Sequence, residues 1–507
     1  MVNRTTFIIL LILLAGAAFR LITSSNGNFL FNMDNARDMV GVRGMVVLHK
    51  FRLIGPTTAI EGLSNGPAWY YLLAIPFLIS GGDPYASIIM EIIFWAAGGF
   101  FLLKLVKAWS IWLIFPIGAI WVSSNYILLA SAYAFNPNPI ILLTPLLIYL
   151  LVKYLENEKA IYGISAWFLG GLFFNFEMNF GIFIPLIILI SIIAVKKLFL
   201  LKQKSFWLGL GFFILTLLPQ IIFDLKHEFL MSRAIMRHLS ENVGGNFNFL
   251  ESFRSISLSF FDTFLATLMN NRLLTLIILI LAIPALLKKG KDQVILVSLI
   301  FIVVPFLGYL ILPVTVNPWH LGAEMAALLV LIAYLLKELI KGNNFKKIIA
   351  ISLSGTFIIF AFGNIFQSVD NYMNKPNIDP SLLKNEIAAI DYVYRKARGQ
   401  NFKVYTYLPS IYDYPYQYLF WWYGQKNYGY LPIDYAYAPN KPEYISNKIA
   451  FSATEDQIKK RTNSGLVFLI KEPNQNYTRF GWEGDFIKLK SISKEMIGPL
   501  EIEIMKE

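Results

Sequence analysis

Two acids and an arginine stand close together in the polar stretch Phe31–Asp38. Asp34 and Asp38 are four residues apart and Arg37 lies between them, so a helix that begins near Asp34 places all three side chains on neighbouring turns. A carboxylate held in this way can take a proton from a hydroxyl group. The simpler interpretation is that Asp34 only caps the helix and Arg37 pairs with an acid at a wet helix end, and the eight residues alone favour it.

The rest of the sequence places this stretch beside a membrane. The chain has 507 residues, of which 56% are hydrophobic and only 15% charged, and its mean hydropathy is +0.56. A soluble chain of this length cannot conceal so much apolar surface, so the sequence predicts an α-helical polytopic membrane protein. About eleven spans, each of about 20 apolar residues, fit before residue 366.

The net charge of +12 reports the topology of these spans and does not indicate a nucleic-acid partner. The lysines fall between apolar runs, at alternate ends of the predicted spans, as expected if each cluster faces the cytoplasm. The five clusters are Lys104 and Lys107; Lys153 and Lys159; Lys196, Lys197, Lys202 and Lys204; Lys288, Lys289 and Lys291; and Lys337, Lys341, Lys346 and Lys347.

The first span, 7–23, is predicted to be a retained anchor, because no small-residue cleavage site follows it. It places residues 24–84 on the outer face as the first extracytoplasmic loop. Within this loop Gly66–Ser80 is apolar but broken by Pro76, and a crossing there would put Lys104 outside. We therefore expect a helix that lies on the outer surface of the membrane.

The composition changes after the last predicted span, and no later run is long enough to cross a bilayer. Residues 1–366 are therefore predicted to form a transmembrane domain and residues 367–507 a soluble domain on the outer face. Alternation in Phe402–Leu408 and Gly465–Lys471 predicts strands, and Pro380–Arg398 has a helical pattern. The C-terminal domain should be α/β.

Aromatic side chains crowd residues 405–437 of that domain. Aromatic rings stack on the faces of sugars, so these residues could form a platform for an acceptor glycan. Packing in a core, or contact with the membrane surface, explains them at least as well.

Further polar candidates are predicted on the outer face. Glu177 and Asn179 interrupt an aromatic run where the chain turns back, and an acid among aromatic residues at membrane depth is a functional candidate. The alternative is a solvated acid near the end of a span. His320 is a weaker candidate, because a lone histidine beside a tryptophan is more often packed at an interface.

A cationic loop follows the predicted span that ends near residue 223. Lys226, His227 and Arg233 belong to the main group of cations on a face otherwise poor in lysine, and a lipid-linked phosphate would need such donors. The alternative is a charged loop that is merely solvated.

The motifs of metal and nucleotide sites are missing from the sequence. It contains no cysteine, no HExxH, no P-loop and no histidine spacing typical of metal ligands. Asp34 and Asp38 together with Glu177 could hold a divalent metal ion through oxygen ligands.

The order of these features resembles the GT-C superfamily of polyprenyl-phosphate-sugar-dependent glycosyltransferases, which includes the protein O-mannosyltransferases and the aminoarabinose transferase of lipid A. The landmarks cover roughly residues 7–366, and their order and sidedness are fairly specific. They are the acids and arginine after the first span (Asp34, Arg37, Asp38), the Gly-Pro-aromatic-Tyr-Tyr helix (Gly66–Tyr71) ending in Gly82-Asp83-Pro84, Asn136-Pro-Asn-Pro139, and Phe223-Asp-Leu-Lys-His227.

The resemblance implies a donor such as undecaprenyl-phosphate-sugar, transfer on the outer face, and inversion at the anomeric carbon. By position, Asp34 is similar to the family's general base or acceptor-positioning acid, with Asp38 in support. Family members commonly carry a second acid directly after the first, where this chain has Asn35; a metal there is then less expected, or its ligand role shifts to Asp38. The residues that the resemblance makes candidates to bind the departing phosphate are Arg37, Lys226, His227 and Arg233.

Other functions remain open. A transporter or flippase of lipid-linked glycans would be expected to bury charges in mid-span or to show paired broken helices. A glycan polymerase or ligase would also use outer cations, but not an acid directly after the first span. A scaffold without activity is a further alternative. The acceptor can be a glycan, a lipid or a protein.

Overall fold

The computed structural model describes residues 4–243, 248–287, 292–312, 316–374, 378–410, 412–441, 444–445, 447–473 and 482–506. The chain forms two compact units. The first consists of Met1–Ile22, Phe51–Leu72 and Ile88–Val369, and the second of Thr23–Lys50, Leu73–Ser87 and Asp370–Glu507. Lys288, Lys289 and Lys291, one of the predicted cytoplasmic clusters, lie outside the described residues.

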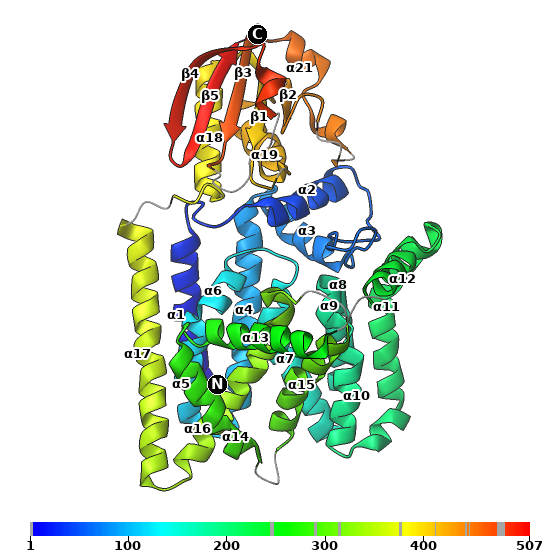
Figure 1. Ribbon diagram of the computed structural model, residues 1–507, viewed down its shortest axis with the longest axis vertical. Helices are drawn as coiled ribbons and strands as arrows, with labels where there is room; N and C mark the ends of the chain where they lie inside the picture. The colour runs from blue at the N-terminus through cyan, green and yellow to red at the C-terminus, as the bar shows by residue number, and fades with distance from the viewer. Residues whose placement is uncertain are drawn as a thin grey trace. The chain divides into compact units, whose positions relative to one another are not determined.

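The first unit is helical (Figure 1). Its α-helices, three of which continue into the second unit, are α1 (Arg4–Ser24), α4 (Pro84–Lys107), α5 (Ile114–Ser123), α6 (Asn125–Ser131), α7 (Asn138–Asn157), α8 (Ala160–Phe176), α9 (Met178–Gly181), α10 (Ile184–Ala194), α11 (Lys204–Lys226), α12 (Leu230–Val243), α13 (Phe249–Thr267), α14 (Arg272–Leu287), α15 (Gln293–Ile311), α16 (Gly322–Ile340) and α17 (Asn344–Asn374). The short 3₁₀ turns are η1 (Ile111–Leu113), η2 (Leu198–Lys202) and η3 (Pro318–Leu321).

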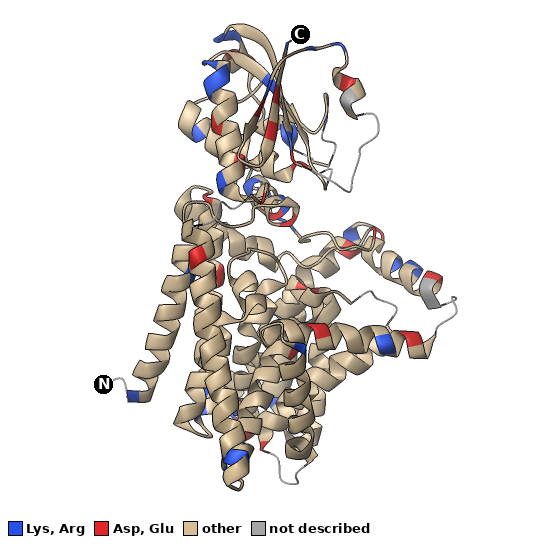
Figure 2. Ribbon diagram, turned by 60° about the vertical axis from the view of Figure 1, so that its left-hand side comes forward, with Lys and Arg blue, Asp and Glu red and all other residues tan. Residues whose placement is uncertain are grey.

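In the described part of the chain, six helices are long and apolar enough to cross a membrane, namely α1, α4, α7, α11, α15 and α17. The number rises to eight if the bent pairs α5–α6 and α13–α14 each count as one span. The other predicted spans are helical as well, but α8 and the α9–α10 segment are shorter and α16 carries charged residues. Figure 2 shows that the long helices carry almost no charged residues between their ends.

Packing within this unit follows from the apolar composition of its helices. Nearly every side chain of α16 is buried, and α16 packs against α7 and α15. A helix that is buried on nearly all sides belongs inside a bundle. By contrast α13 is bent by 108° from α14 and lies across the long helices in Figure 1.

The second unit holds the predicted α/β domain together with parts of the first loop. Its helices are α2 (Met33–Val47), α18 (Leu383–Ala397), α19 (Tyr414–Leu419), the π-helical turn η4 (Phe420–Gly424), α20 (Gln425–Tyr428) and α21 (Glu455–Lys459), with the turns η5 (Lys448–Phe451) and η6 (Trp482–Phe486); α3 (Ala68–Ser80) is divided between the two units. The strands are β1 (Asn401–Tyr407), β2 (Asp434–Ala436), β3 (Asn463–Lys471), β4 (Lys490–Ile497) and β5 (Leu500–Lys506).

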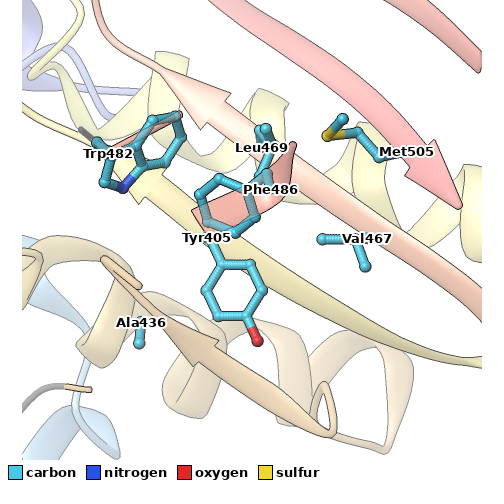
Figure 3. Close-up of a cluster of buried hydrophobic side chains, with 7 residues drawn as sticks. All are labelled: Tyr405, Ala436, Val467, Leu469, Trp482, Phe486 and Met505. Atoms are coloured by element: carbon cyan, nitrogen blue, oxygen red, sulfur yellow. The ribbon is translucent and has the colours of Figure 1, made fainter. Parts of the chain in front are cut away.

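The five strands form one mixed sheet in the order β2-β1-β3-β5-β4. β1 pairs in parallel with β2 and β3, whereas β3–β5 and β5–β4 are antiparallel. Helix α18 contacts β3, β4 and β5. Figure 3 shows a cluster of buried apolar side chains of this domain, which includes Tyr405, Leu469 and Trp482. The strands predicted at Phe402–Leu408 and Gly465–Lys471 and the helix predicted within Pro380–Arg398 are confirmed.

Backbone hydrogen bonds tie the first loop to this domain. The Phe31 N–H donates to the Ser381 carbonyl at 2.8 Å, and the Leu383 N–H donates to the Phe29 carbonyl at 3.1 Å. Leu30 and Leu382 form an isolated antiparallel bridge between them. The chain that leads into α2 is therefore held by the residues that lead into α18.

Candidate active site

Helix α2 begins where the acids suggest, but Asp34 is not its cap. Asn32 is the N-cap residue, and its side-chain oxygen accepts the Asp34 N–H at 3.2 Å. The simpler interpretation of Asp34 as an ordinary cap is therefore wrong. Asp34 stands in the first turn, where a carboxylate interacts favourably with the positive end of the helix dipole.

Arg37 bridges the two acids. Its Nη1 lies 3.2 Å from Oδ1 of Asp34, and its Nε lies 2.9 Å from Oδ1 of Asp38. The Asp38 side chain is 0% exposed, whereas that of Asp34 is 32% exposed. Of the two predicted catalytic acids, Asp34 is therefore the one that a substrate can reach, and Asp38 orients Arg37.

Asn35, which stands where the GT-C pattern commonly has a second acid, turns away from these carboxylates. Its side chain is buried, and Nδ2 donates to the Leu30 carbonyl at 2.7 Å. The residue thus fixes the chain before α2.

The far end of α2 is anchored by Arg43. This residue is 1% exposed, its Nη1 donates to the Gln417 carbonyl at 2.7 Å, and its guanidinium lies 4.0 Å from the centre of the Phe451 ring. Burial lowers the pKa of Arg43. The Gln417 amide in turn donates to Asp413 at 2.9 Å and to the Tyr435 carbonyl at 2.6 Å. Helix α2 is thereby connected to α19 and β2.

Glu177, Asn179 and His320 come together in the first unit. Glu177 lies in the turn between α8 and α9, and its carboxylate caps α9 by accepting the Asn179 N–H at 3.3 Å. Nδ2 of Asn179 lies 3.2 Å from Nε2 of His320, and the Tyr309 hydroxyl donates to the backbone oxygens of both residues at 3.3 Å. His320 also accepts the Asn317 N–H through Nδ1 at 3.2 Å. Glu177 is buried, so the interpretation of a merely solvated acid does not apply to it.

The segment before α3 supports this turn. The Asn65 side chain accepts the Met178 N–H at 3.1 Å, and the Gly66 N–H donates to the Asn175 carbonyl at 2.9 Å. Gly66 can make this approach because it has no side chain; a Cβ atom there would lie 1.9 Å from Oδ1 of Asn175. The turn at Glu177 is thus packed from two directions.

The predicted phosphate-binding cations lie at the junction of α11 and α12. Lys226, His227 and Arg233 are exposed. The His227 ring stacks on Phe223 with centroids 4.0 Å apart. Asp224 caps the next helix by accepting the Met231 N–H at 2.7 Å. The junction therefore has a defined backbone although its cationic side chains are exposed.

Sequence reasoning missed charged side chains buried inside apolar helices. Arg20, Glu91 and Glu324 are each 0% exposed. Arg20 donates to Oγ of Ser131 at 2.7 Å and lies 3.8 Å from the Trp95 ring centre. Among the described residues neither carboxylate, that of Glu91 or that of Glu324, has a hydrogen-bond partner. A single charge within an otherwise apolar run was the available signal.

No group of three or more His, Cys, Asp or Glu side chains that could hold a metal ion occurs among the residues that the structure describes. The two carboxylates of α2 are bridged by Arg37, and Asp38 is covered. A divalent ion between them would have to displace the guanidinium, so this donor set does not fit a metal as it stands.

No protein-family model and no curated protein sequence matches the chain. Solved structures do match. The crystal structure of ArnT from Cupriavidus metallidurans bound to undecaprenyl phosphate aligns with a TM-score of 0.61 at 10% sequence identity, over 99% of this chain and 98% of that chain. Its apo state gives a TM-score of 0.62 at 9% identity over the same shares. The chain therefore has the fold of ArnT, and the predicted architecture of a helical multi-pass membrane protein with a C-terminal domain is confirmed.

Proposed function

We propose that the chain is an integral-membrane glycosyltransferase that moves a sugar from a polyprenyl-phosphate-linked donor to an acceptor on the outer face of the membrane. The observation that carries the proposal is the fold shared, over nearly the full length of both chains, with a protein crystallised with undecaprenyl phosphate. The partly exposed acid at the start of α2 supports it.

The proposed reaction needs one base and one anion-binding group. Asp34 takes the proton of the acceptor hydroxyl while that oxygen forms a bond to C1 of the sugar. The bond between C1 and the phosphate oxygen breaks, and the lipid phosphate leaves with the electron pair. Attack opposite the leaving group inverts the configuration at C1. A positioned base accounts for about a 10²- to 10⁴-fold acceleration.

Arg37 and Asp38 act as positioning residues for this base. Asp38 fixes the guanidinium through Nε, and the guanidinium fixes the Asp34 carboxylate through Nη1. Because two of its N–H groups already serve carboxylates, Arg37 is less available to a phosphate than the exposed Lys226 and Arg233. Lys226, His227 and Arg233 stay, with Arg37, the candidates to hold the departing phosphate.

Purified protein in lipid nanodiscs tests the proposal. The donors are polyprenyl-phosphate-linked mannose, glucose and aminoarabinose, and the signal is release of polyprenyl phosphate with a membrane extract as the acceptor source. Replacing Asp34 with Asn should lower the rate by about 10²- to 10⁴-fold. Asp456→Asn, which changes an exposed acid of α21, is the matched control.

The alternatives give other results. Donor turnover that is unchanged in Asp34→Asn removes this residue from the mechanism. Movement of an intact labelled lipid across a vesicle, without release of polyprenyl phosphate, indicates a flippase. Turnover of a pyrophosphate-linked glycan alone indicates a polymerase or ligase.

A further inference from the structure

Four tyrosines of the second unit form a continuous group of rings where α19 begins. We call Tyr412, Tyr414, Tyr437 and Tyr444 the tyrosine cluster. The centroids of Tyr412 and Tyr414 are 5.9 Å apart at 23°, and those of Tyr437 and Tyr444 are 6.0 Å apart at 9°, so each pair is stacked. Tyr444 joins the pairs, because its ring lies 4.9 Å from both Tyr412 and Tyr414.

The cluster keeps ring surface in contact with solvent. Tyr412 is 43% exposed, and the other three rings are partly exposed. Tyr416 and Tyr418, which follow directly in α19, are 1% and 0% exposed. Rings that serve only a core are covered like these two, so the cluster has apolar ring faces that the fold itself leaves partly uncovered.

Hydrogen bonds hold the cluster in place. The Tyr444 hydroxyl donates to Oδ1 of Asp413 and accepts the Asp413 N–H at 2.8 Å. Asp413 is fully buried, and the Gln417 amide donates to its other oxygen at 2.9 Å. The Tyr437 carbonyl accepts the Trp482 indole N–H at 2.5 Å. A surface fixed before binding loses little conformational freedom when a ligand arrives.

One residue of the cluster, Tyr414, begins a helix that packs against α2. This helix is α19, and it lies with α2 in the second unit (Figure 1). Burial raises the pKa of Tyr414 to about 12, while Arg37 acts to lower it and Asp38 to raise it, so the Tyr414 hydroxyl is within electrostatic reach of both. No hydrogen bond of this hydroxyl occurs among the described residues.

We propose that the tyrosine cluster is the binding site for an acceptor saccharide. A sugar ring stacks its C–H face on the exposed Tyr412, and the Tyr414 hydroxyl directs the sugar's reacting hydroxyl toward Asp34. The cluster consists of uncharged side chains, which suits a neutral saccharide. The assignment rests on the proposed glycosyltransferase function, and it names the chemical class of the acceptor for that reaction.

Saturation-transfer NMR on the full-length protein in nanodiscs tests the site without any donor. The probes are mannotriose, maltotriose and chitotriose, each added alone. At least one should receive saturation from aromatic protons at its ring C–H positions. Tyr412→Ala should weaken its affinity at least tenfold, and Tyr412→Phe, which keeps the ring, should restore it. Tyr412 is the most exposed ring named above, so its replacement should leave the fold intact, which a thermal melt checks.

Tyr428→Ala is the matched control, because Tyr428 is also a partly exposed, stacked tyrosine of this unit, with its ring 4.2 Å from that of Tyr394 in α18. The control should bind as wild type does. The proposal is overturned if none of the three saccharides binds, if Tyr412→Ala binds like wild type, or if Tyr428→Ala loses as much affinity.

Donor turnover separates this proposal from the one on which it rests. With the saccharide that binds as acceptor, Tyr412→Ala should raise KM for the acceptor at least tenfold and leave kcat nearly unchanged. Saccharide binding without release of polyprenyl phosphate from any donor supports the site and contradicts the glycosyltransferase function. Release of polyprenyl phosphate with membrane extract, but no saccharide binding, does the reverse.

Discussion

Nη1 of Arg43 donates a hydrogen bond to the carbonyl oxygen of Gln417 at 2.7 Å, across 374 positions of the sequence. Arg43 lies on the same helix as Asp34, and Gln417 lies on the helix that begins with Tyr414. The contact therefore connects the proposed base to the proposed acceptor site. Arg43 is buried, and its guanidinium contacts an aromatic ring and a carbonyl oxygen, which makes the contact sensitive to substitution.

Replacing Arg43 with Met should separate α2 from α19. The Gln417 carbonyl would lose a charged donor, which costs about 2 kcal/mol of stability, partly offset because no charge remains buried. Displacement of α2 should also lower kcat by about 10- to 100-fold. A thermal melt and donor turnover measure the two effects. Arg395→Met, at an exposed position of α18, should change neither. Equal melting temperatures and equal donor turnover in the two variants would contradict a role for Arg43 in holding α2.

Because Asp38 acts on Asp34 through Arg37, we expect the effects of replacing Asp34 and Asp38 on the rate to be non-additive. Asp38→Asn alone should lower turnover, because Arg37 then no longer holds the Asp34 carboxylate in place. Once Asp34 is Asn, the second change should add little loss of rate. Single-turnover rates of the two single variants and the double variant measure this. Losses that multiply would show that Asp38 acts independently of Asp34.

Buried acids predict a pH dependence of stability in the C-terminal domain. Burial, with nearby Asp379 acting in the same direction, raises the pKa of Glu472 to about 8; burial also raises the pKa of Glu386, with Glu472 in the same direction. An unfolded glutamate titrates near pH 4.3, about the reference value. Between these values the folded chain holds a proton that the unfolded chain has lost, so stability falls as pH rises through this window.

Glu472→Gln removes that titration. Its melting temperature should exceed that of wild type at pH values near 8, and the difference should shrink toward the acid end of the window. Asp456→Asn, an exposed acid of the same domain, should follow wild type at every pH. If the melting temperatures of Glu472→Gln and wild type differ by the same amount at every pH in this window, the result contradicts a raised pKa of Glu472.

Gly66 predicts a steric effect on the turn at Glu177. In Gly66→Ala the new Cβ would meet Oδ1 of Asn175 at 1.9 Å, so either the segment before α3 or the Asn175 side chain must move. The expected loss of stability is about 1 to 3 kcal/mol. Gly211→Ala in α11, where no atom lies within 4 Å of the added carbon, is the control and should be neutral or slightly stabilising. Thermal melts of the two variants decide the matter.

Local patterns predicted the elements and the membrane character well. The apolar runs, the helix near Asp34 and the strand at Gly465–Lys471 each follow from residues adjacent in sequence. They could not show that Asn32 supplies the cap, because Asn32 and Asp34 are both good capping residues two positions apart. Nor could they show that Asp34 is partly exposed and Asp38 covered, since this difference comes from packing.

The tyrosines show the same limit. Their number in residues 405–437 was evident, but which rings are covered and which keep a free face depends on contacts between distant segments. Tyr414 and Tyr416 are two positions apart on one short helix, yet only Tyr416 is fully buried. Tyr444, whose ring joins the two stacked pairs, lies outside the aromatic-rich residues 405–437.

The second unit consists of Thr23–Lys50, Leu73–Ser87 and Asp370–Glu507, so its first two segments are synthesised long before the third with which they pack. When α2 leaves the ribosome, its partner Gln417 is still 374 residues from Arg43. At about 5 to 20 residues per second, α2 must wait roughly 20 to 75 seconds for that partner. A chain cut short before residue 417 therefore cannot complete the contact that anchors α2, the helix of the proposed base.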